Sequence, residues 1–309
     1  MIKQSFLLFF SLIMLSLCAK AQQVQQPYIQ LLGTAQDAGY PQMGCTRNCC
    51  TSAWKTDSLR KYVASFALVD PATKKWWLFE ATPDIKEQLH LFQQLTKNAF
   101  AFLPEGIFIT HAHIGHYTGL MQLGREVMNA QAVPVYVLPK LKSFLETNGP
   151  WSQLVKLNNI ALHTMQADSQ VVINDHISVT AVTVPHRDEY SETAGFKIQA
   201  GAKKILFIPD IDKWQKWNSN IVQEVSRTDI ALLDATFYDA QELPGRDISE
   251  IPHPLVTETM QLFNNSSAAI RNKIFFIHFN HTNPLLWDNN TQKKTLQQGF
   301  NIAQQGAKL

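Results

Sequence analysis

Residues 107–120 read IFITHAHIGHYTGL, and this stretch decides how the rest of the chain is interpreted. An apolar β-type run, Ile107–Thr110, is followed at once by three of the ten histidines, His111, His113 and His116. Neutral imidazole is the commonest metal ligand in proteins, and open α/β folds bind ligands at the carboxyl ends of their strands. The stretch therefore predicts a metal site rather than a polar loop that happens to hold histidines.

The spacing of these histidines suggests their geometry. His111 and His113 are two residues apart, so their rings point to the same side and can share one metal, while His116 is displaced towards a second position. Three histidines leave the fourth tetrahedral position to water, which is the open arrangement of a catalytic zinc. Gly115 and Gly119 are expected to permit the tight backbone that brings the imidazoles together.

Further ligand-type residues directly follow other apolar runs, and each taken alone could be a capping or hydrogen-bonded residue. Because strand ends can converge at one edge of a sheet, their joint occurrence predicts a common site with the histidine loop. These residues are His186, Asp210, His278 and, three residues beyond the last, His281.

Short apolar runs separated by helical patterns predict one α/β domain over residues 22–309, with sheets sandwiched between helices. The expected strands are 29–33, 65–70, 75–80, 107–110, 133–138, 160–165, 177–184, 196–200, 204–208, 230–233 and 274–277. The second and third of them form a predicted hairpin. Expected helices begin at Thr82-Pro83-Asp84 and lie around 214–225, 255–263 and 293–305.

Residues 1–21 have the pattern of a secretory signal peptide, with Lys3, an apolar run over 6–17 and the cleavage signal Ala19-Lys20-Ala21. We expect cleavage after Ala21, in preference to lipoprotein processing at Cys18, and a periplasmic or secreted protein without a membrane segment. Loss of two lysines makes the number of basic residues, 27 in the full chain, equal to the 25 acidic ones. This balance argues against nucleic acid and favours a small-molecule substrate, while the oligomeric state stays open.

The segment THAHIGHYTG resembles the His-x-His-x-Asp-His signature of metallo-β-lactamase-fold hydrolases, and the later ligand-type residues follow that family's order. The resemblance implies an αββα sandwich of two mixed sheets flanked by helices, with one or two metals between the sheets. It assigns His111, His113 and His186 to the first metal, Asp210 as the bridge, and His116 and His278 to the second metal.

Within that superfamily the chain resembles the pyrroloquinoline quinone biosynthesis protein B group. The resemblance lies in LLGTAQDAGYPQMGC from Leu31, ATPDIKEQL from Ala81, VPHRDEYSETAGF from Val184 and IHFNHTNPLL from Ile277. Members of that group lack the first two histidines and the later aspartate of the ligand set, whereas this chain has His111, His113 and Asp210. On its ligands the chain is therefore more similar to the hydrolases.

Gly115 stands where the family signature has an aspartate that ligates the second metal. We therefore expect a weakened second site, and a mononuclear or asymmetric centre. Asp37 could stand in for the missing carboxylate, although we favour an ordinary loop residue. Asp188 and Glu189 are expected either to orient His186 or to face solvent.

Cys45, Cys49 and Cys50 lie in GCTRNCC, and three clustered thiols cannot all pair with one another. The cluster falls where relatives of the resembling group carry a structural zinc, and by analogy His253 would be the fourth ligand. We favour this zinc site over a disulfide from Cys45 to Cys49 or Cys50, which an oxidising compartment would promote.

The sequence thus predicts an exported zinc-dependent hydrolase of the metallo-β-lactamase fold. Metal-bound hydroxide would attack a carbonyl or phosphorus ester centre, with Asp210 or His281 moving protons. One alternative is an oxidative enzyme of the quinone-biosynthesis type, with Fe²⁺ in the same pocket. Another is a degenerate protein that binds a metal or ligand without catalysis.

Overall fold

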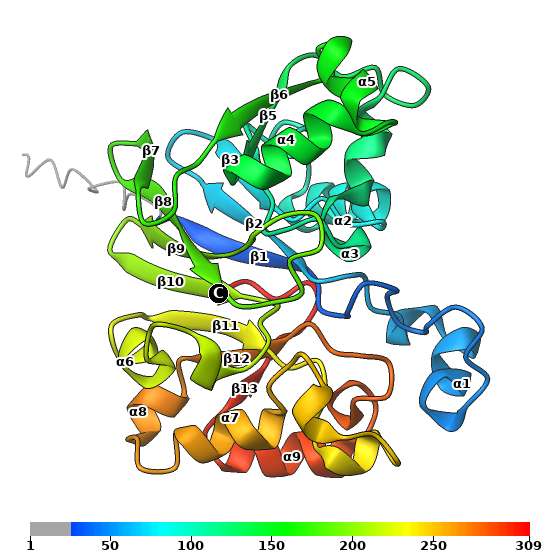
Figure 1. Ribbon diagram of the computed structural model, residues 1–309, viewed down its shortest axis with the longest axis vertical. Coiled ribbons are helices and arrows are strands. Elements are labelled where there is room, and N and C mark those ends of the chain that lie inside the picture. The colour runs from blue at the N-terminus through cyan, green and yellow to red at the C-terminus, as the bar shows by residue number, and fades with distance from the viewer. Residues whose placement is uncertain (1–25) are drawn as a thin grey trace, which may run out of the picture.

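The computed structural model describes residues 26–309, so the signal peptide expected at 1–21 lies outside the described residues. Two mixed β-sheets pack face to face, and helices cover the outer face of each sheet (Figure 1). This is the αββα sandwich that the resemblance implied. Within residues 26–309, no helix is both long enough and apolar enough to span a lipid bilayer.

The first sheet has six strands in sequence order, β1-β2-β3-β4-β5-β6. They are β1 (Tyr28–Gly33), β2 (Ser65–Asp70), β3 (Lys75–Phe79), β4 (Ile107–Phe108), β5 (Val133–Val137) and β6 (Ile160–Thr164). The first three strands are antiparallel, and β3 to β6 are parallel. The predicted hairpin is confirmed, because Phe66 of β2 lies opposite Phe79 of β3.

The second sheet has seven strands in the order β13-β12-β11-β10-β9-β8-β7. They are β7 (Gln170–Asn174), β8 (Ile177–Val184), β9 (Thr193–Ala200), β10 (Lys203–Ile208), β11 (Ile230–Asp234), β12 (Ile274–Ile277) and β13 (Asn301–Ile302). Strands β7 to β10 are antiparallel and β10 to β13 are parallel. The two edge strands, β7 and β13, were not predicted.

Helices α2, α4 and α5 lie beside the first sheet, and α6 to α9 lie beside the second (Figure 1). The α-helices are α1 (Asn48–Lys55), α2 (Ile85–Thr96), α3 (Ile114–Tyr117), α4 (Pro139–Thr147), α5 (Trp151–Lys156), α6 (Ile221–Ser226), α7 (Val256–Leu262), α8 (Ala268–Arg271) and α9 (Asn289–Gln297). Short 3-10 turns are η1 (Asp57–Leu59), η2 (Thr118–Leu123), η3 (Trp214–Lys216), η4 (Ala240–Glu242), η5 (Ile248–Glu250) and η6 (Pro284–Leu286).

Two of the expected helices are shorter than predicted. The helix expected over 214–225 is divided into η3 and α6, and the indole N–H groups of Trp214 and Trp217 are anchored in the core. They donate to Thr259 Oγ1 and to the Thr183 carbonyl, each at 2.9 Å. The helix expected over 293–305 ends earlier, at the end of α9, and the chain then pairs with the sheet as β13.

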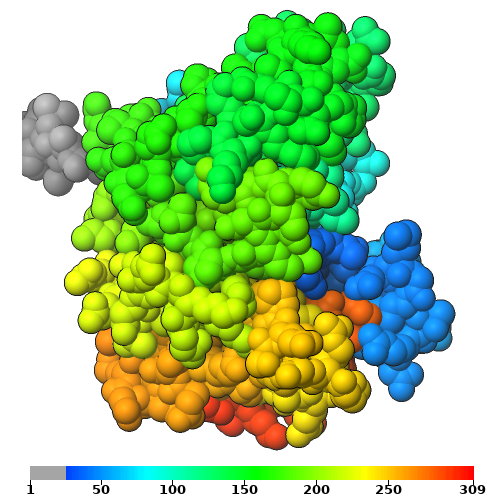
Figure 2. Space-filling model, viewed as in Figure 1, coloured from blue at the N-terminus to red at the C-terminus, as the bar shows by residue number. Residues whose placement is uncertain are grey.

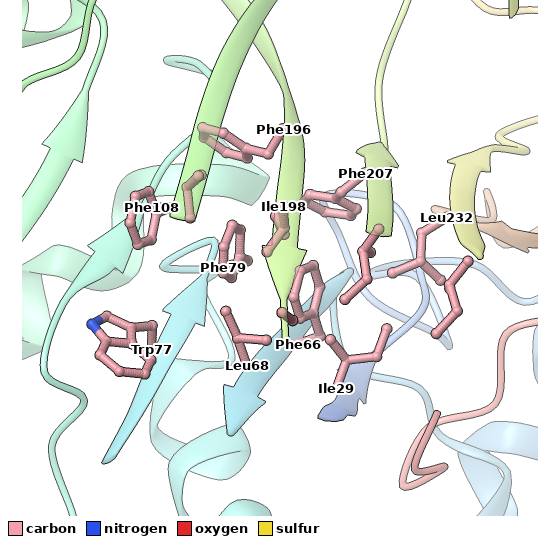
Figure 3. Packing of buried hydrophobic residues seen from close by; sticks show 14 of the residues in the cluster. Ile29, Phe66, Leu68, Trp77, Phe79, Phe108, Phe196, Ile198, Phe207 and Leu232 are labelled. Atoms are coloured by element: carbon pink, nitrogen blue, oxygen red, sulfur yellow. The ribbon is translucent and has the colours of Figure 1, made fainter. Parts of the chain in front are cut away.

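The core between the sheets combines aliphatic side chains with a cluster of packed aromatic rings (Figure 3). Phe79 stacks on Phe66 at 4.4 Å and on Phe108 at 4.9 Å between ring centroids, and all three come from the first sheet. Phe196 and Phe207 of the second sheet meet them edge-on, at 5.5 Å from Phe79 and 5.0 Å from Phe66. Such edge-to-face pairs fix the relative position of the two sheets. Strand ends from both sheets are thereby held along one edge of the sandwich.

The segment that contains α1 stands out from the main body of the molecule (Figures 1 and 2). A small cluster of buried residues, Ala35, Tyr40, Cys50 and Ala53, connects it to the loop after β1. This projection carries the three cysteines, and the loop that leads to it carries Asp37.

Candidate metal centre

The loop after β4 brings its three histidines together. The ring centroid of His111 lies 4.4 Å from that of His113 and 4.2 Å from that of His116, which is in α3. Thr110 supports the loop, because its Oγ1 lies 2.9 Å from His111 Nδ1. His111 and His116 are buried. The histidine cluster read from the sequence is therefore a cluster in space.

The glycines of this loop matter for their size rather than for unusual backbone angles. Neither Gly115 nor Gly119 is among the residues with positive φ. A Cβ atom on Gly119 would lie 2.1 Å from the carbonyl oxygen of Thr82. The Gly119 N–H donates to the Ala81 carbonyl at 2.8 Å, so the first residues of η2 pack directly on the backbone of Ala81 and Thr82. The expected role of glycine flexibility is thus corrected to one of close approach.

The first group of candidate ligands is the one that the resemblance implied. His111, His113, His186 and Asp210 each offer one ligand atom, all within 4.8 Å of one another. Asp210 Oδ2 lies 3.4 Å from His111 Nε2 and 3.2 Å from His186 Nε2. His186 Nε2 in turn lies 3.3 Å from His113 Nδ1. These residues follow β4, β8 and β10, three strands that end at the same edge.

Glu189 orients His113 rather than its neighbour in sequence, His186. Its Oε2 lies 2.9 Å from His113 Nε2, which leaves Nδ1 of that ring facing the first group. Asp188 has a different role and accepts a hydrogen bond from Thr193 Oγ1 at 2.8 Å. Neither carboxylate therefore orients His186, and of our two alternatives the exposed position of both residues agrees with the solvent-facing one.

A second group consists of Asp37, His116 and His278. Asp37 Oδ1 lies 3.4 Å from His116 Nε2 and 3.9 Å from His278 Nε2. Asp210 Oδ2 is 3.8 Å from His116 Nε2, so this carboxylate lies between the two groups. The expectation of a weakened second group rested on Gly115 alone. The structure supplies a carboxylate from Asp37, which we had favoured as an ordinary loop residue.

Two residues that sequence reasoning missed support the second group. Glu80 is fully buried, with Oε1 3.4 Å from His116 Nδ1, and its Oε2 accepts from the Thr110 N–H at 3.2 Å. Thr236 Oγ1 lies 3.0 Å from His278 Nδ1. Glu80 and His278 both have left-handed backbone, with φ of 73° and 68°. That conformation is uncommon for residues other than glycine and often marks a functional site.

His253 lies with Asp210 and His278 in the pocket formed by the two histidine groups, which we call the histidine pocket. It is not near the three cysteines, so its predicted place as their fourth ligand is wrong. Its Nδ1 lies 2.9 Å from Asp234 Oδ2 and 3.1 Å from Asp210 Oδ1. Burial alone would lower the pKa of His253, but the two carboxylates raise it to about 10. Asp234 was also missed, although it ends the apolar strand β11 just as Asp210 follows β10.

His281 completes the cysteine group, together with Cys45, Cys49 and Cys50. Its Nδ1 lies 3.3 Å from Cys50 Sγ and 3.8 Å from Cys49 Sγ. The predicted proton-transfer role of His281 is therefore wrong, since the ring is engaged by thiols. The reason is a long-range backbone contact, because the Phe279 carbonyl accepts from the Gln36 N–H at 2.8 Å and directs the following residues towards the cysteine loop.

The thiols of Cys45, Cys49 and Cys50 are all free in the described residues. The Sγ atoms of Cys45 and Cys49 are 3.9 Å apart, well beyond the roughly 2.05 Å of a disulfide. Burial raises the pKa of Cys50 to about 12, reinforced by its hydrogen bond with Cys45. Three thiols and one imidazole form the donor set of a closed, tetrahedral structural zinc site.

The two histidine groups fit bound cations because their ligand atoms lack other partners. Within residues 26–309, these side-chain atoms are buried and have no hydrogen-bond partner: Asp37 Oδ1, His111 Nε2, His116 Nε2 and His278 Nε2. Buried polar atoms of this kind are rare in native proteins and costly to leave unsatisfied. Four of them converging on one pocket indicate that cations belong there.

Electrostatics of the first group agree with this assignment. Burial would raise the pKa of Asp210, but the charges of His253 and His186 outweigh it and hold the pKa well below its usual value. Burial, with the neighbouring His116 charge, lowers the pKa of His111 well below its usual value. An ionised carboxylate and a neutral imidazole are the forms that coordinate metal.

Comparison with known proteins identifies the family to which the chain belongs. Residues 75–279, from β3 to just past His278, match the model of the beta-lactamase superfamily domain. Coenzyme PQQ synthesis protein B from Methylorubrum extorquens (strain PA1) is 25% identical over 314 residues, which cover 91% of this chain and 99% of that protein. The protein of the same name from Klebsiella pneumoniae (strain 342) is 26% identical, covering 90% and 96%.

Solved structures show the same fold. The zinc-bound crystal structure of PqqB from Methylobacterium extorquens has a TM-score of 0.72 at 21% identity, covering 91% of this chain and 99% of that one. A diphosphatase from the PhnP family has a TM-score of 0.66 at 19% identity, covering 92% and 97%. With the sandwich fold and the clustered ligands, these matches show that the chain belongs to the beta-lactamase superfamily and is similar to the coenzyme PQQ synthesis protein B group.

Proposed function

We propose that the protein is a zinc-dependent hydrolase that cleaves a carbonyl or phosphorus ester bond of a small molecule at a two-metal centre. The observation that carries this proposal is the position of the Asp210 carboxylate. Its Oδ2 lies 3.4 Å from His111 Nε2 on one side and 3.8 Å from His116 Nε2 on the other. One carboxylate can therefore serve two neighbouring cations, an arrangement suited to hydrolysis.

When bound, the cations would acidify a water molecule and polarise the oxygen of the bond to be cleaved. The chain's own residues supply orientation and proton transfer. Glu189 fixes the ring of His113, and Asp234 fixes the ring of His253 through Nδ1. In the reaction, a water oxygen bonds to the carbon or phosphorus and the bond to the leaving group breaks. One proton of the water passes to the leaving group, and His253, whose Nδ1 lies 3.1 Å from Asp210 Oδ1, is the side chain placed to assist this transfer.

The test is turnover in the absence of oxygen. Zinc-loaded protein is assayed under nitrogen with a panel of esters, lactones, β-lactams and phosphodiesters, and at least one class should be hydrolysed. His113→Ala should lose metal and turnover together, whereas His90→Ala, at an exposed position of α2, should lose neither. Turnover that survives in metal-free protein would overturn the mechanism.

A second candidate function follows from the similarity to coenzyme PQQ synthesis protein B, which extends over 91% of this chain. In that case the pocket would hold Fe²⁺ and catalyse an oxidation. Oxygen uptake by iron-loaded protein, with no hydrolysis of the panel, would favour it. Full metal occupancy with neither activity would instead favour a protein that binds a metal or ligand without catalysis.

We also propose that the protein is exported, on the basis of the signal-peptide pattern in residues 1–21. N-terminal sequencing of the protein from fractionated cells tests this directly. The expected result is a chain that starts at Gln22 in the periplasm or medium. An intact Met1 in the cytoplasmic fraction would contradict export and leave the metal chemistry unaffected.

A further inference from the structure

We infer that Asp37 is the carboxylate ligand of the second metal, and that position 115 is glycine so that Asp37 can reach that place. The inference rests on the proposed metal centre but not on hydrolysis. Asp37 lies outside the residues 75–279 that match the family model, so the ligand comes from a segment that the model does not include.

The first argument is the space beside Gly115. A Cβ atom built there would lie 2.1 Å from Asp37 Oδ1 and 2.7 Å from Asp37 Cα. Contacts below 3.0 Å are essentially never seen for real Cβ atoms, so no side chain fits at position 115 while Asp37 is in place. An aspartate at 115 and the observed Asp37 therefore exclude each other. The carboxylate missing from the signature is replaced in space by one from the loop after β1.

The second argument is that the backbone holds Asp37 in this position. The Gln36 N–H donates to the Phe279 carbonyl at 2.8 Å, and the Phe279 N–H donates to the Thr34 carbonyl at 2.9 Å. These bonds attach the loop directly to the residue after His278. Asp37 and His278 are therefore brought together by main-chain pairing rather than by a chance contact of side chains.

The third argument is that the other nearby carboxylate cannot take this role. Glu80 Oε1 faces His116 Nδ1 at 3.4 Å, whereas Asp37 Oδ1 faces the opposite ring nitrogen, Nε2, at the same distance. Nε2 of His116 also faces Asp210 Oδ2, at 3.8 Å. Glu80 thus orients the ring from behind, and Asp37 lies on the metal-binding side.

The resulting donor set is two imidazoles and two carboxylates, from His116, His278, Asp37 and Asp210. Imidazole and carboxylate donors suit Zn²⁺, Fe²⁺ or Mn²⁺. The second group therefore has a full set of ligands, and the centre should bind two cations.

The experiment measures bound metal rather than activity. Full-length Asp37→Asn and Gly115→Ala are loaded with zinc, freed of excess metal by gel filtration, and analysed for zinc per chain. Both variants should contain one equivalent fewer than wild type, and calorimetric titration should show second-cation affinity reduced about 100-fold or more. Gly115→Ala is informative because it removes no ligand and acts only by displacing Asp37.

Matched variants serve as controls. Gly149→Ala, at a glycine with nothing within 4 Å of the added Cβ, and Asp57→Asn, at an exposed aspartate, should keep the wild-type metal content. Asp37→Asn changes no shape, so it tests the inference even if Gly115→Ala fails to fold. Wild-type metal content in Asp37→Asn, or loss of a metal in Glu80→Gln but not in Asp37→Asn, would overturn it. Loss of one equivalent without hydrolysis in any form of the protein would sustain this inference while refuting the proposed hydrolase.

Discussion

His278 and His281 are separated by two residues, yet their imidazoles face different candidate metal sites. His278 Nε2 lies 3.9 Å from Asp37 Oδ1, and His281 Nδ1 lies 3.3 Å from Cys50 Sγ. Asp37, the partner of His278, likewise comes shortly before Cys45, Cys49 and Cys50 in the chain. The segments that carry Asp37 and His278 therefore both continue to residues of the cysteine group. A metal bound by the cysteines would hold Asp37 and His278 in place.

Cys50→Ser should consequently affect two sites. We expect loss of the cysteine-bound metal and a fall in Tm on the order of 5–10 °C, because a buried ligand set of one imidazole and three thiols is broken. We also expect second-cation affinity in the histidine pocket to fall about tenfold, as is typical when residues that position a ligand are disturbed. Differential scanning calorimetry and metal titration measure the two effects.

Ser52→Ala is the matched control, since Ser52 lies on the exposed side of the same helix, α1. It should behave as wild type. If Cys50→Ser loses its metal but binds the second cation with unchanged affinity, the two sites are independent and the coupling is wrong.

Removal of metal should destabilise the protein as a whole. Buried ligand atoms such as His111 Nε2 and His116 Nε2 are left without partners when no cation is present. A cation that binds only the folded state stabilises it by about 4 kcal/mol at 1,000 times its Kd. Chelator-treated protein should therefore show a lower Tm that rises with the logarithm of added zinc. The same titration on Cys50→Ser isolates the histidine pocket, and a Tm independent of zinc in that variant would argue against cations there.

The ligands at strand ends could be predicted because an apolar run followed by a polar residue can be recognised from the local sequence. His186, Asp210 and His278 each follow such a run, and because β8, β10 and β12 run in the same direction in one sheet, their ends lie at one edge. The core strands were predictable for the same reason. Strand β7 was missed because it is a partly exposed edge, and β13 because two residues are too few to give a pattern.

The exchange between His253 and His281 could not be predicted from local pattern. Both lie in irregular segments whose path depends on long-range contacts, such as Asp234 with His253 and Gln36 with Phe279. The position of Asp37 beside the ligands was not predicted for a similar reason. The only indication in the sequence was Gly115, where the aspartate of the family signature is missing. A glycine in place of an expected ligand is better interpreted as space for another residue than as loss of the site.

Glu189→Ala should weaken the first metal site. The Glu189 carboxylate accepts from His113 Nε2 at 2.9 Å and fixes the ring with Nδ1 towards Asp210 and His186. Loss of such a partner typically reduces metal affinity 10- to 100-fold, and we expect about tenfold because Glu189 is half exposed. Calorimetric zinc titration measures the change. Glu105→Ala removes an equally exposed carboxylate that pairs with Lys75, and it should leave affinity unaltered. Equal affinities in the two variants would contradict an orienting role.

Glu242 should make stability depend on pH between about 4.5 and 7. Burial raises the pKa of this carboxyl from 4.5 to about 7, against the opposing hydrogen bonds from Thr282 Oγ1 and the Tyr238 N–H. Because the folded state holds the proton more tightly than the unfolded state, the stabilisation is complete below pH 4.5. It is lost as the pH rises through 7, by at most roughly 3 kcal/mol.

Glu242→Gln removes this titration and should flatten the decrease in Tm between pH 5 and pH 8. The comparison uses the pH slope rather than absolute stability, because the glutamine amide cannot accept from both Thr282 and Tyr238. Glu250→Gln, on an exposed residue of the same loop, should retain the wild-type slope. A wild-type slope in Glu242→Gln would show that other groups control the pH dependence.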